Sequence, residues 1–90
     1  MLLAKVIGTV VATRKNQNLV GNKFLIVETL EEMKDGGRRL VAVDQAGAGI
    51  GELVLVALGS AARQEPGAEA SSIDAAIVGI VDDPDEIYIR

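Results

Sequence analysis

The stretch RLVAVDQAGAGIGELVLVAL, residues 39–58, decides the fold, because it holds two apolar runs joined by a loop of very small residues. In residues 39–44 the side chains alternate in character, which is typical of a β-strand. Residues 53–58 are continuously apolar, which indicates a strand buried on both faces. Two short strands separated by a glycine-rich loop therefore form the centre of the predicted fold.

Similar runs of β-branched and small residues flank this centre. We predict further strands over residues 3–13, 23–30 and 73–81, and a short edge strand over residues 86–90. Gly8 and Gly79 lie inside two of these strands, where a glycine marks a bend or a close backbone approach. We predict at most one helical turn, over residues 60–64, with Ser60 as its N-cap. Five or six short strands with almost no helix predict an all-β barrel or sandwich, and the glycines inside strands favour the closed barrel.

The composition is strongly aliphatic for so short a chain. Its 90 residues are enough for one domain, spanning residues 1–90. Hydrophobic residues make up 49% of the chain, yet Phe24 and Tyr88 are its only aromatic residues. We expect Phe24 in the core and Tyr88 at an edge or interface. A small domain buries its own surface poorly, and large exposed apolar patches usually mark interaction sites. The composition therefore predicts burial against other subunits.

The charge pattern argues against nucleic acid and membranes as partners. The formal net charge is −4, and no basic run exceeds two residues. Nucleic acids and anionic membranes are bound by clustered positive charge, which this chain lacks. The longest apolar runs are too short to span a bilayer, and the first residues lack the basic start of a signal peptide. We therefore expect a cytoplasmic protein.

The sequence offers little for catalysis. It contains no His, which is the commonest general base, and no Cys, which supplies the thiolate nucleophile. Ser60 and Arg63 resemble a nucleophile and an anion binder, but no base lies nearby in sequence, which favours a capping role. Gly47, Gly49 and Gly51 follow a strand as in a dinucleotide-binding motif, but Glu52 stands where the last glycine belongs. We expect no cofactor, no metal and no enzymatic activity.

The glycine loop has two other interpretations. It is an ordinary flexible loop that needs positive φ angles, or its small side chains let several backbones crowd together around a symmetry axis.

Several motifs together resemble one known family. In chain order they are VIGTVVAT (6–13), LVGNKFL (19–25), AVDQAGAGIGELVLV (42–56), GSAAR (59–63) and DAAIVGIVD (74–82). Each motif alone is of modest specificity, but the ordered set covers nearly the whole chain. It resembles the EutN/CcmL family of bacterial microcompartment vertex proteins. The segment 65–72 and the residues after 82 match nothing in particular.

This resemblance implies a fold, an assembly and a set of candidate residues. The fold is a five-stranded OB-like barrel, and the assembly is a homopentamer that closes the five-fold vertices of a polyhedral shell tiled by hexameric shell proteins. It also implies a narrow axial opening. Our candidates for lining that opening are Ala46, Gly47, Ala48, Gly49, Ile50 and Gly51. Our candidates for fixing the loop or forming a subunit contact are Asp44, Glu52, Ser60, Arg63 and Asp74.

Three other interpretations remain at this point. An OB-fold module that binds single-stranded nucleic acid is opposed by the acidic charge and the missing aromatic residues. A small enzyme using carboxylates at a subunit interface has no feature that names a substrate. A six-fold ring would keep the family but change the position in the shell.

Overall fold

The fold was obtained as a computed structural model, in which residues 1–11, 23–31, 36–59, 75–83 and 87 are described. Some of the sequence predictions fall elsewhere. The helical turn at residues 60–64 lies outside the described residues, and so does Tyr88. Of the predicted edge strand at residues 86–90, only Ile87 is described, and it is not in a strand.

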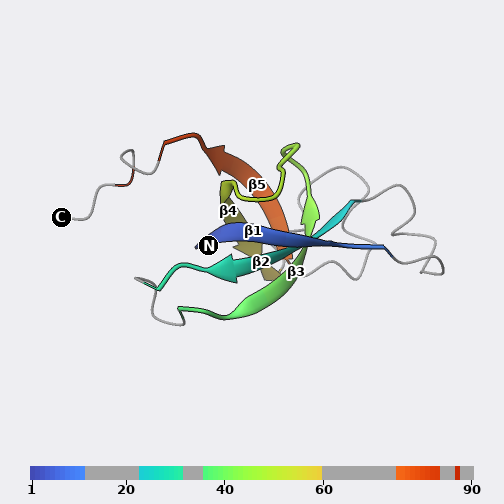
Figure 1. Cartoon of the computed structure of the whole chain (residues 1–90), viewed down its shortest axis with the longest axis horizontal. Helices are drawn as coiled ribbons and strands as arrows, with labels where there is room; N and C mark the ends of the chain where they lie inside the picture. The colour runs from blue at the N-terminus through green and yellow to red at the C-terminus, as the bar shows by residue number, and fades with distance from the viewer. Residues whose placement is uncertain (12–22, 32–35, 60–74, 84–86, 88–90) are drawn as a thin grey trace.

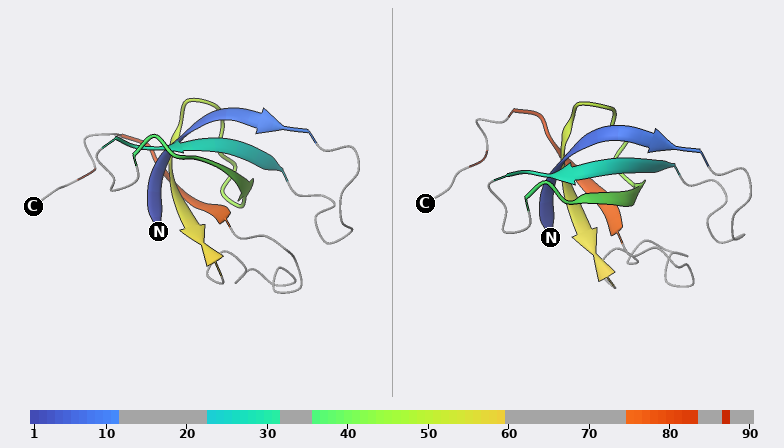
Figure 2. Two further views of the ribbon diagram at one scale, coloured as in Figure 1. Left: turned by 90° about the horizontal axis from the view of Figure 1, so that it is seen from below. Right: turned by 60° about the horizontal axis from the view of Figure 1, so that its bottom comes forward.

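The described residues form five strands that close into a barrel (Figures 1 and 2). The strands are β1 (Leu2–Val10), β2 (Phe24–Thr29), β3 (Arg39–Asp44), β4 (Leu53–Leu58) and β5 (Ala75–Val81). Around the barrel their order is β1-β2-β3-β5-β4, and β4 pairs with β1 to close it. All neighbours are antiparallel except β3 and β5, which are parallel. No helix occurs in the described part of the chain, so the predicted all-β, five-stranded closed barrel is confirmed.

The strand pairing has two irregularities, and each lies next to a glycine that was predicted to mark a bend or a close backbone approach. In the pairing of β1 with β2 the register shifts between Val6 and Gly8. In the pairing of β4 with β5 it shifts between Leu55 and Val56, and Gly79 pairs with Leu55. A β-carbon on Gly79 would lie 3.4 Å from Leu55 Cδ1, so the glycine gives that leucine room. Such bulges increase local twist and curvature, which a closed barrel of short strands requires.

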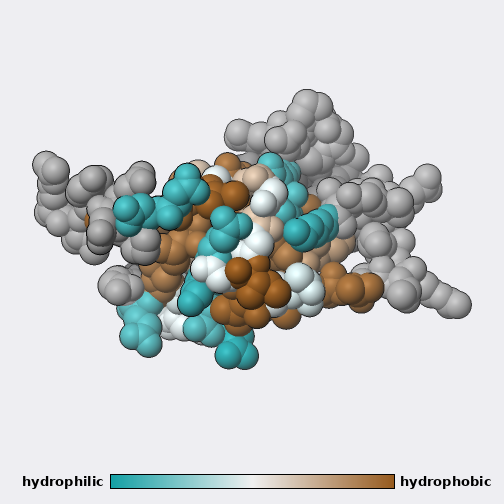
Figure 3. Space-filling view, turned by 45° about the horizontal axis from the view of Figure 1, so that its top comes forward, coloured by the Kyte–Doolittle hydropathy of each residue, from teal (hydrophilic) through white to brown (hydrophobic). Residues whose placement is uncertain are grey.

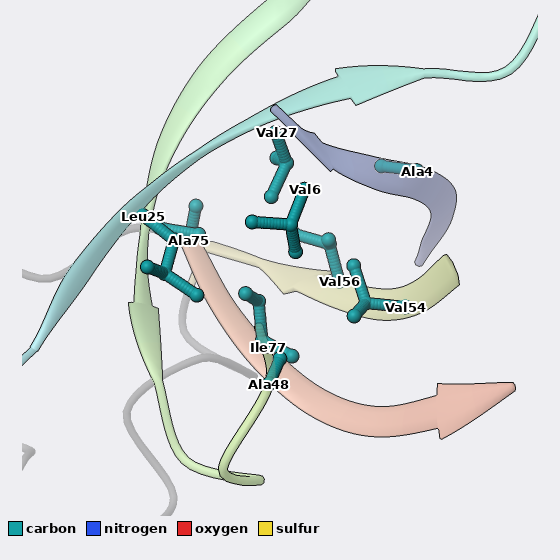
Figure 4. Packing of buried hydrophobic residues seen from close by; sticks show 10 residues of the cluster. Ala4, Val6, Leu25, Val27, Ala48, Val54, Val56, Ala75 and Ile77 are labelled. Carbon is teal, nitrogen blue, oxygen red and sulfur yellow. The ribbon is translucent and has the colours of Figure 1, made fainter. Parts of the chain in front are cut away.

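The core follows from strand alternation. Along β2, Leu25, Val27 and Thr29 are buried, whereas the residues between them are half-buried. The interior is made by residues from all five strands and by Ala48 (Figure 4). Its buried members are Ala4, Val6, Leu25, Val27, Ala42, Ala48, Val54, Val56, Ala75 and Ile77. These side chains are small or branched, which suits a narrow barrel filled by short side chains.

A second, smaller cluster lies apart from this interior. Val43, Ala57 and Ala76 are buried there, and the half-buried Phe24 packs against them. The expected core position of Phe24 is therefore confirmed in part. Val56 and Ala57 are adjacent and both buried, so β4 is covered on both faces at that point. The prediction of burial on both faces does not extend along β4, because Leu53, Leu55 and Leu58 are half-buried.

Candidate functional site

The loop between β3 and β4, residues 44–52, is organised by the carboxylate of Asp44. Its Oδ1 atom accepts hydrogen bonds from the backbone N–H groups of Ala46, Gly47 and Ala48, at 3.0, 3.0 and 3.1 Å. The Asp44 side chain is only 3% exposed. Hydrogen bonds to an ionised acceptor are stronger than bonds between neutral groups. One side chain at the end of β3 thus fixes the first half of the loop.

The second half of the loop is held by Glu52 and by β1. Glu52 Oε1 accepts a hydrogen bond from the N–H of Gly49, at 2.5 Å. The N–H of Gly51 donates to the carbonyl of Val6, and the N–H of Val6 donates to the carbonyl of Glu52, at 2.8 and 3.0 Å. The loop is thereby joined to the neighbouring strand, and its end cannot move without breaking those bonds.

Two of the loop glycines have backbone conformations that other residues rarely adopt. Gly47 has φ of 78° and Gly51 has φ of 91°, which lie in the left-handed region. A positive φ is therefore required at these two positions, as one interpretation of the sequence expected. Gly49 is different, because no positive φ is found there and a β-carbon would meet only Glu52 Oε1, at 3.3 Å. The φ angle of Gly49 therefore does not require a glycine at this position.

Lys23 belongs to the same site, although it was not among the residues predicted from the sequence. It comes just before β2, and its Nζ donates to the carbonyl of Ala48 at 3.2 Å and lies 3.9 Å from Asp44 Oδ2. Its carbonyl also accepts the N–H of Asp44, at 2.8 Å. The lysine thus links the start of β2 to the loop. Only pairing of β2 with β3 brings residue 23 beside residue 44, and no local motif reveals that pairing.

Ala48 anchors the loop to the barrel. It is 2% exposed and belongs to the interior cluster with Ile77 (Figure 4). The carbonyl of Ile77 accepts the N–H of Gln45, at 3.0 Å. The loop, yellow-green between β3 and β4 in Figure 1, therefore rests on β5 as well as on β1. Its exposed residues are Gly47, Ile50 and Gly51, whereas Ala46 and Gly49 are half-buried.

Ser60, Arg63 and Asp74 lie outside the described residues. A small pocket at the base of the loop is lined by Gly51, Glu52, Leu53, Val81 and Asp82. Within the described ranges no group of three or more metal-binding side chains occurs. The same part of the chain holds no helix that is long and apolar enough to cross a membrane.

Comparison with known proteins gives one consistent family. The family model described as "Ethanolamine utilisation protein EutN/carboxysome" matches residues 1–82. The microcompartment shell vertex protein GrpN of Rhodospirillum rubrum is 55% identical over 83 residues, covering 91% of this chain and 93% of that protein. The carboxysome shell vertex protein CcmL of Synechocystis is 52% identical over 83 residues, covering 91% of this chain and 83% of that protein.

Solved structures agree with the sequence matches. The pentameric microcompartment shell protein GrpN from Rhodospirillum rubrum superposes with a TM-score of 0.77 at 52% identity, covering 92% of this chain and 94% of that one. A pentameric shell protein from the RMM microcompartment has a TM-score of 0.82 at 36% identity, covering 100% and 99% of the two chains. The fold is thus shared with proteins described as pentameric shell components.

Proposed function

Because this chain belongs to the EutN/CcmL family, we propose that it is a structural shell protein whose homopentamers close the five-fold vertices of a polyhedral bacterial microcompartment. The observation that carries this proposal is the similarity to GrpN along almost the whole of both chains. The single-stranded nucleic-acid alternative is not favoured, because the relatives are shell vertex proteins. The protein acts in the cytoplasm, as part of the shell, and beside hexameric shell proteins.

The role is mechanical and not catalytic. A flat hexagonal layer cannot close, and five-fold units supply the curvature at its corners. A ring of identical subunits needs two different faces on each subunit that fit each other and whose rotation closes. Neither a cofactor nor a reactive side chain takes part in that task.

One outward apolar strip runs across β1, β2 and β3, and consists of Ile7, Ile26 and Val41. Ile26 pairs directly with Val41, and with Gly8 next to Ile7. Ile7 is 38% and Val41 is 53% exposed. These residues alternate with interior ones, so they point away from the core. They supply one candidate face for a neighbouring subunit.

A second outward apolar strip crosses β1, β4 and β5, and consists of Leu3, Leu53, Leu55 and Val81. Leu3 pairs with Leu55, and Leu53 pairs with Val81. All four are half-buried in the single chain. Figure 3 shows one face of the molecule, on which hydrophobic residues lie at the surface between hydrophilic ones. Two different strips on one subunit fit the heterologous contact that a closed ring needs.

The loop at residues 44–52 is our candidate for lining the axial opening of the ring, with Ala46–Gly51 facing it. Support comes from Gly49, whose φ is not positive and where a β-carbon would require only a small shift of the Glu52 side chain, 3.3 Å away at Oε1. Small residues that are not needed locally are expected where copies of a backbone approach an axis. Ser60, Arg63 and Asp74 remain candidates for fixing the loop or forming a subunit contact.

Native mass spectrometry and sedimentation of the purified protein test the assembly directly. We expect one dominant species of five subunits at micromolar concentration. Six subunits would keep the family but remove the vertex role. A stable monomer at high concentration would overturn the proposal, because the apolar strips would then have no partner.

Gly49→Arg tests the position of the loop. A β-carbon at residue 49 meets only the flexible end of Glu52, so the barrel is expected to fold with a far-ultraviolet circular dichroism spectrum like that of the original protein. Five arginines crowded near one axis repel each other, so the pentamer is expected to dissociate or its opening to change. Gly49→Ala is the control and should assemble normally. An unchanged Gly49→Arg pentamer with an unchanged opening would place the loop away from the axis.

A further inference from the structure

The two outward apolar strips differ in the charges beside them. At one end of the second strip, Glu52 comes just before Leu53 and Asp82 comes just after Val81. Leu53 and Val81 pair with each other, so both carboxylates stand at the same end of that strip. The strands β4 and β5 themselves contain no charged residue. The second strip therefore ends in two acidic side chains.

The two carboxylates line one small pocket. Its lining residues are Gly51, Glu52, Leu53, Val81 and Asp82. Glu52 is half-buried and its Oε1 accepts the N–H of Gly49, whereas Asp82 is exposed. A carboxylate has two oxygens and accepts more than one hydrogen bond. An apolar wall beside carboxylates fits a long side chain with an aliphatic stem and a cationic head.

The first strip is bordered by such a side chain. Arg39 lies two residues before Val41 on β3, so the two side chains point to the same, outward face. The Arg39 side chain is 71% exposed, and its Nε donates to Oε2 of Glu28 at 3.0 Å. A guanidinium has five N–H donors in a fixed fork, so this bond leaves donors for a second carboxylate.

These charges favour one mode of contact between copies of the chain. Contact of two second strips would bring the carboxylates of both copies together, and like charges facing each other across an interface are costly. Contact of a first strip with a second strip brings Arg39 towards Glu52 and Asp82, and opposite charges fix partner and register. A face that binds itself gives only a pair, whereas contact between two different faces is what a ring requires.

We propose that Arg39 of one subunit enters the pocket between Glu52 and Asp82 of the next subunit, and thereby selects the head-to-tail contact from which the ring is built. This pairing rests on the proposed function, since it names which strips meet in the homopentamer. Lys5 does not distinguish the strips, because it pairs with Glu28 on one side and with Leu53 on the other. The apolar residues supply the buried area, and the charges decide which faces meet.

Charge exchange, followed by native mass spectrometry and sedimentation over a range of subunit concentrations, tests the pairing. Arg39→Glu and Asp82→Arg, each alone, place like charges across the contact and should raise the concentration at which half of the rings dissociate by about tenfold or more. The double variant Arg39→Glu/Asp82→Arg restores opposite charges and should recover most of that loss. It has the same disturbed pair with Glu28 as the single Arg39 variant, so its recovery cannot come from better folding of the subunit.

Arg38→Glu is the matched control. Arg38 is exposed, lies just before β3 instead of on it, and undergoes the same change of charge. This variant should assemble at the same concentration as the original protein.

The outcomes separate the two proposals. Failure of the original protein to form a ring contradicts the proposed function. An original ring whose single charge variants dissociate no more readily than Arg38→Glu overturns the inference alone, and so does a double variant that assembles no better than the weaker single variant. If circular dichroism shows that a charge-reversed variant does not fold, Arg39→Gln and Asp82→Asn replace the pair. Their combined effect should then be no larger than that of either alone, because both remove one shared contact, and additive effects would overturn the inference.

Discussion

Replacing Leu25 with alanine is expected to lower the free energy of unfolding by about 2–5 kcal/mol, the usual cost of emptying a fully buried leucine site. Leu25 is 0% exposed and is among the largest fully buried side chains described. It packs in the barrel interior among small residues, which have little freedom to fill the space. For a 90-residue chain, whose stability is a small difference between large terms, such a loss is severe.

Denaturant unfolding at a fixed subunit concentration measures this effect, because the apparent stability of an assembling protein depends on concentration. Leu25→Met keeps the volume and should cost less than about 1.5 kcal/mol. Val11→Ala alters a residue that is 86% exposed and should stay within about 0.5 kcal/mol. If Leu25→Ala unfolded at the same denaturant concentration as Val11→Ala, the barrel interior would not be the source of stability that the structure indicates.

Local sequence patterns were sufficient to predict the strands. Residues 39–44 and 53–58 were predicted with the bounds that the structure has. The first strand was predicted to run to residue 13, but β1 ends at Val10. β-branched residues continue beyond that point, so the pattern alone cannot show where pairing stops. Where a strand ends depends on its partner, and the last residue of β1 that pairs with β2 is Val10, opposite Phe24.

The pairing of β3 with β5 could not be predicted. It is parallel and joins Val43 to Ala76 and Asp44 to Ile77, residues more than thirty positions apart. Alternation along each strand tells which face is buried, but it does not tell which strand lies alongside. For the same reason the link from Lys23 to Asp44 was missed, since it depends on the pairing of β2 with β3.

Only part of the candidate site could be predicted from the sequence. Glycine-rich composition predicted positive φ angles, and the structure has them at Gly47 and Gly51. Asp44 and Glu52 were predicted with the same role, either fixing the loop or contacting a subunit. Their separate hydrogen bonds to the two halves of the loop appear only in three dimensions. That residues 46–51 line an opening stays a prediction, because it depends on neighbours that a single chain does not contain.

Asp44→Ala is expected to destabilise the protein by about 2–3 kcal/mol, since it removes the acceptor shared by three backbone N–H groups and such groups are costly to leave unpaired. Exposed Gly47 can turn to water, whereas Ala48 is 2% exposed and its N–H cannot. Asp44→Asn keeps an oxygen in the same place and should cost about 1 kcal/mol, because it loses the charge assistance and the long ion pair with Lys23 but leaves the three N–H groups an acceptor. Denaturant unfolding gives both values, and amide exchange at residues 46–48 should be faster in Asp44→Ala than in Asp44→Asn. If the two variants were equally stable and equally protected, the Asp44 carboxylate would not hold the loop, and its order would have to come from the bonds of Glu52 and Lys23.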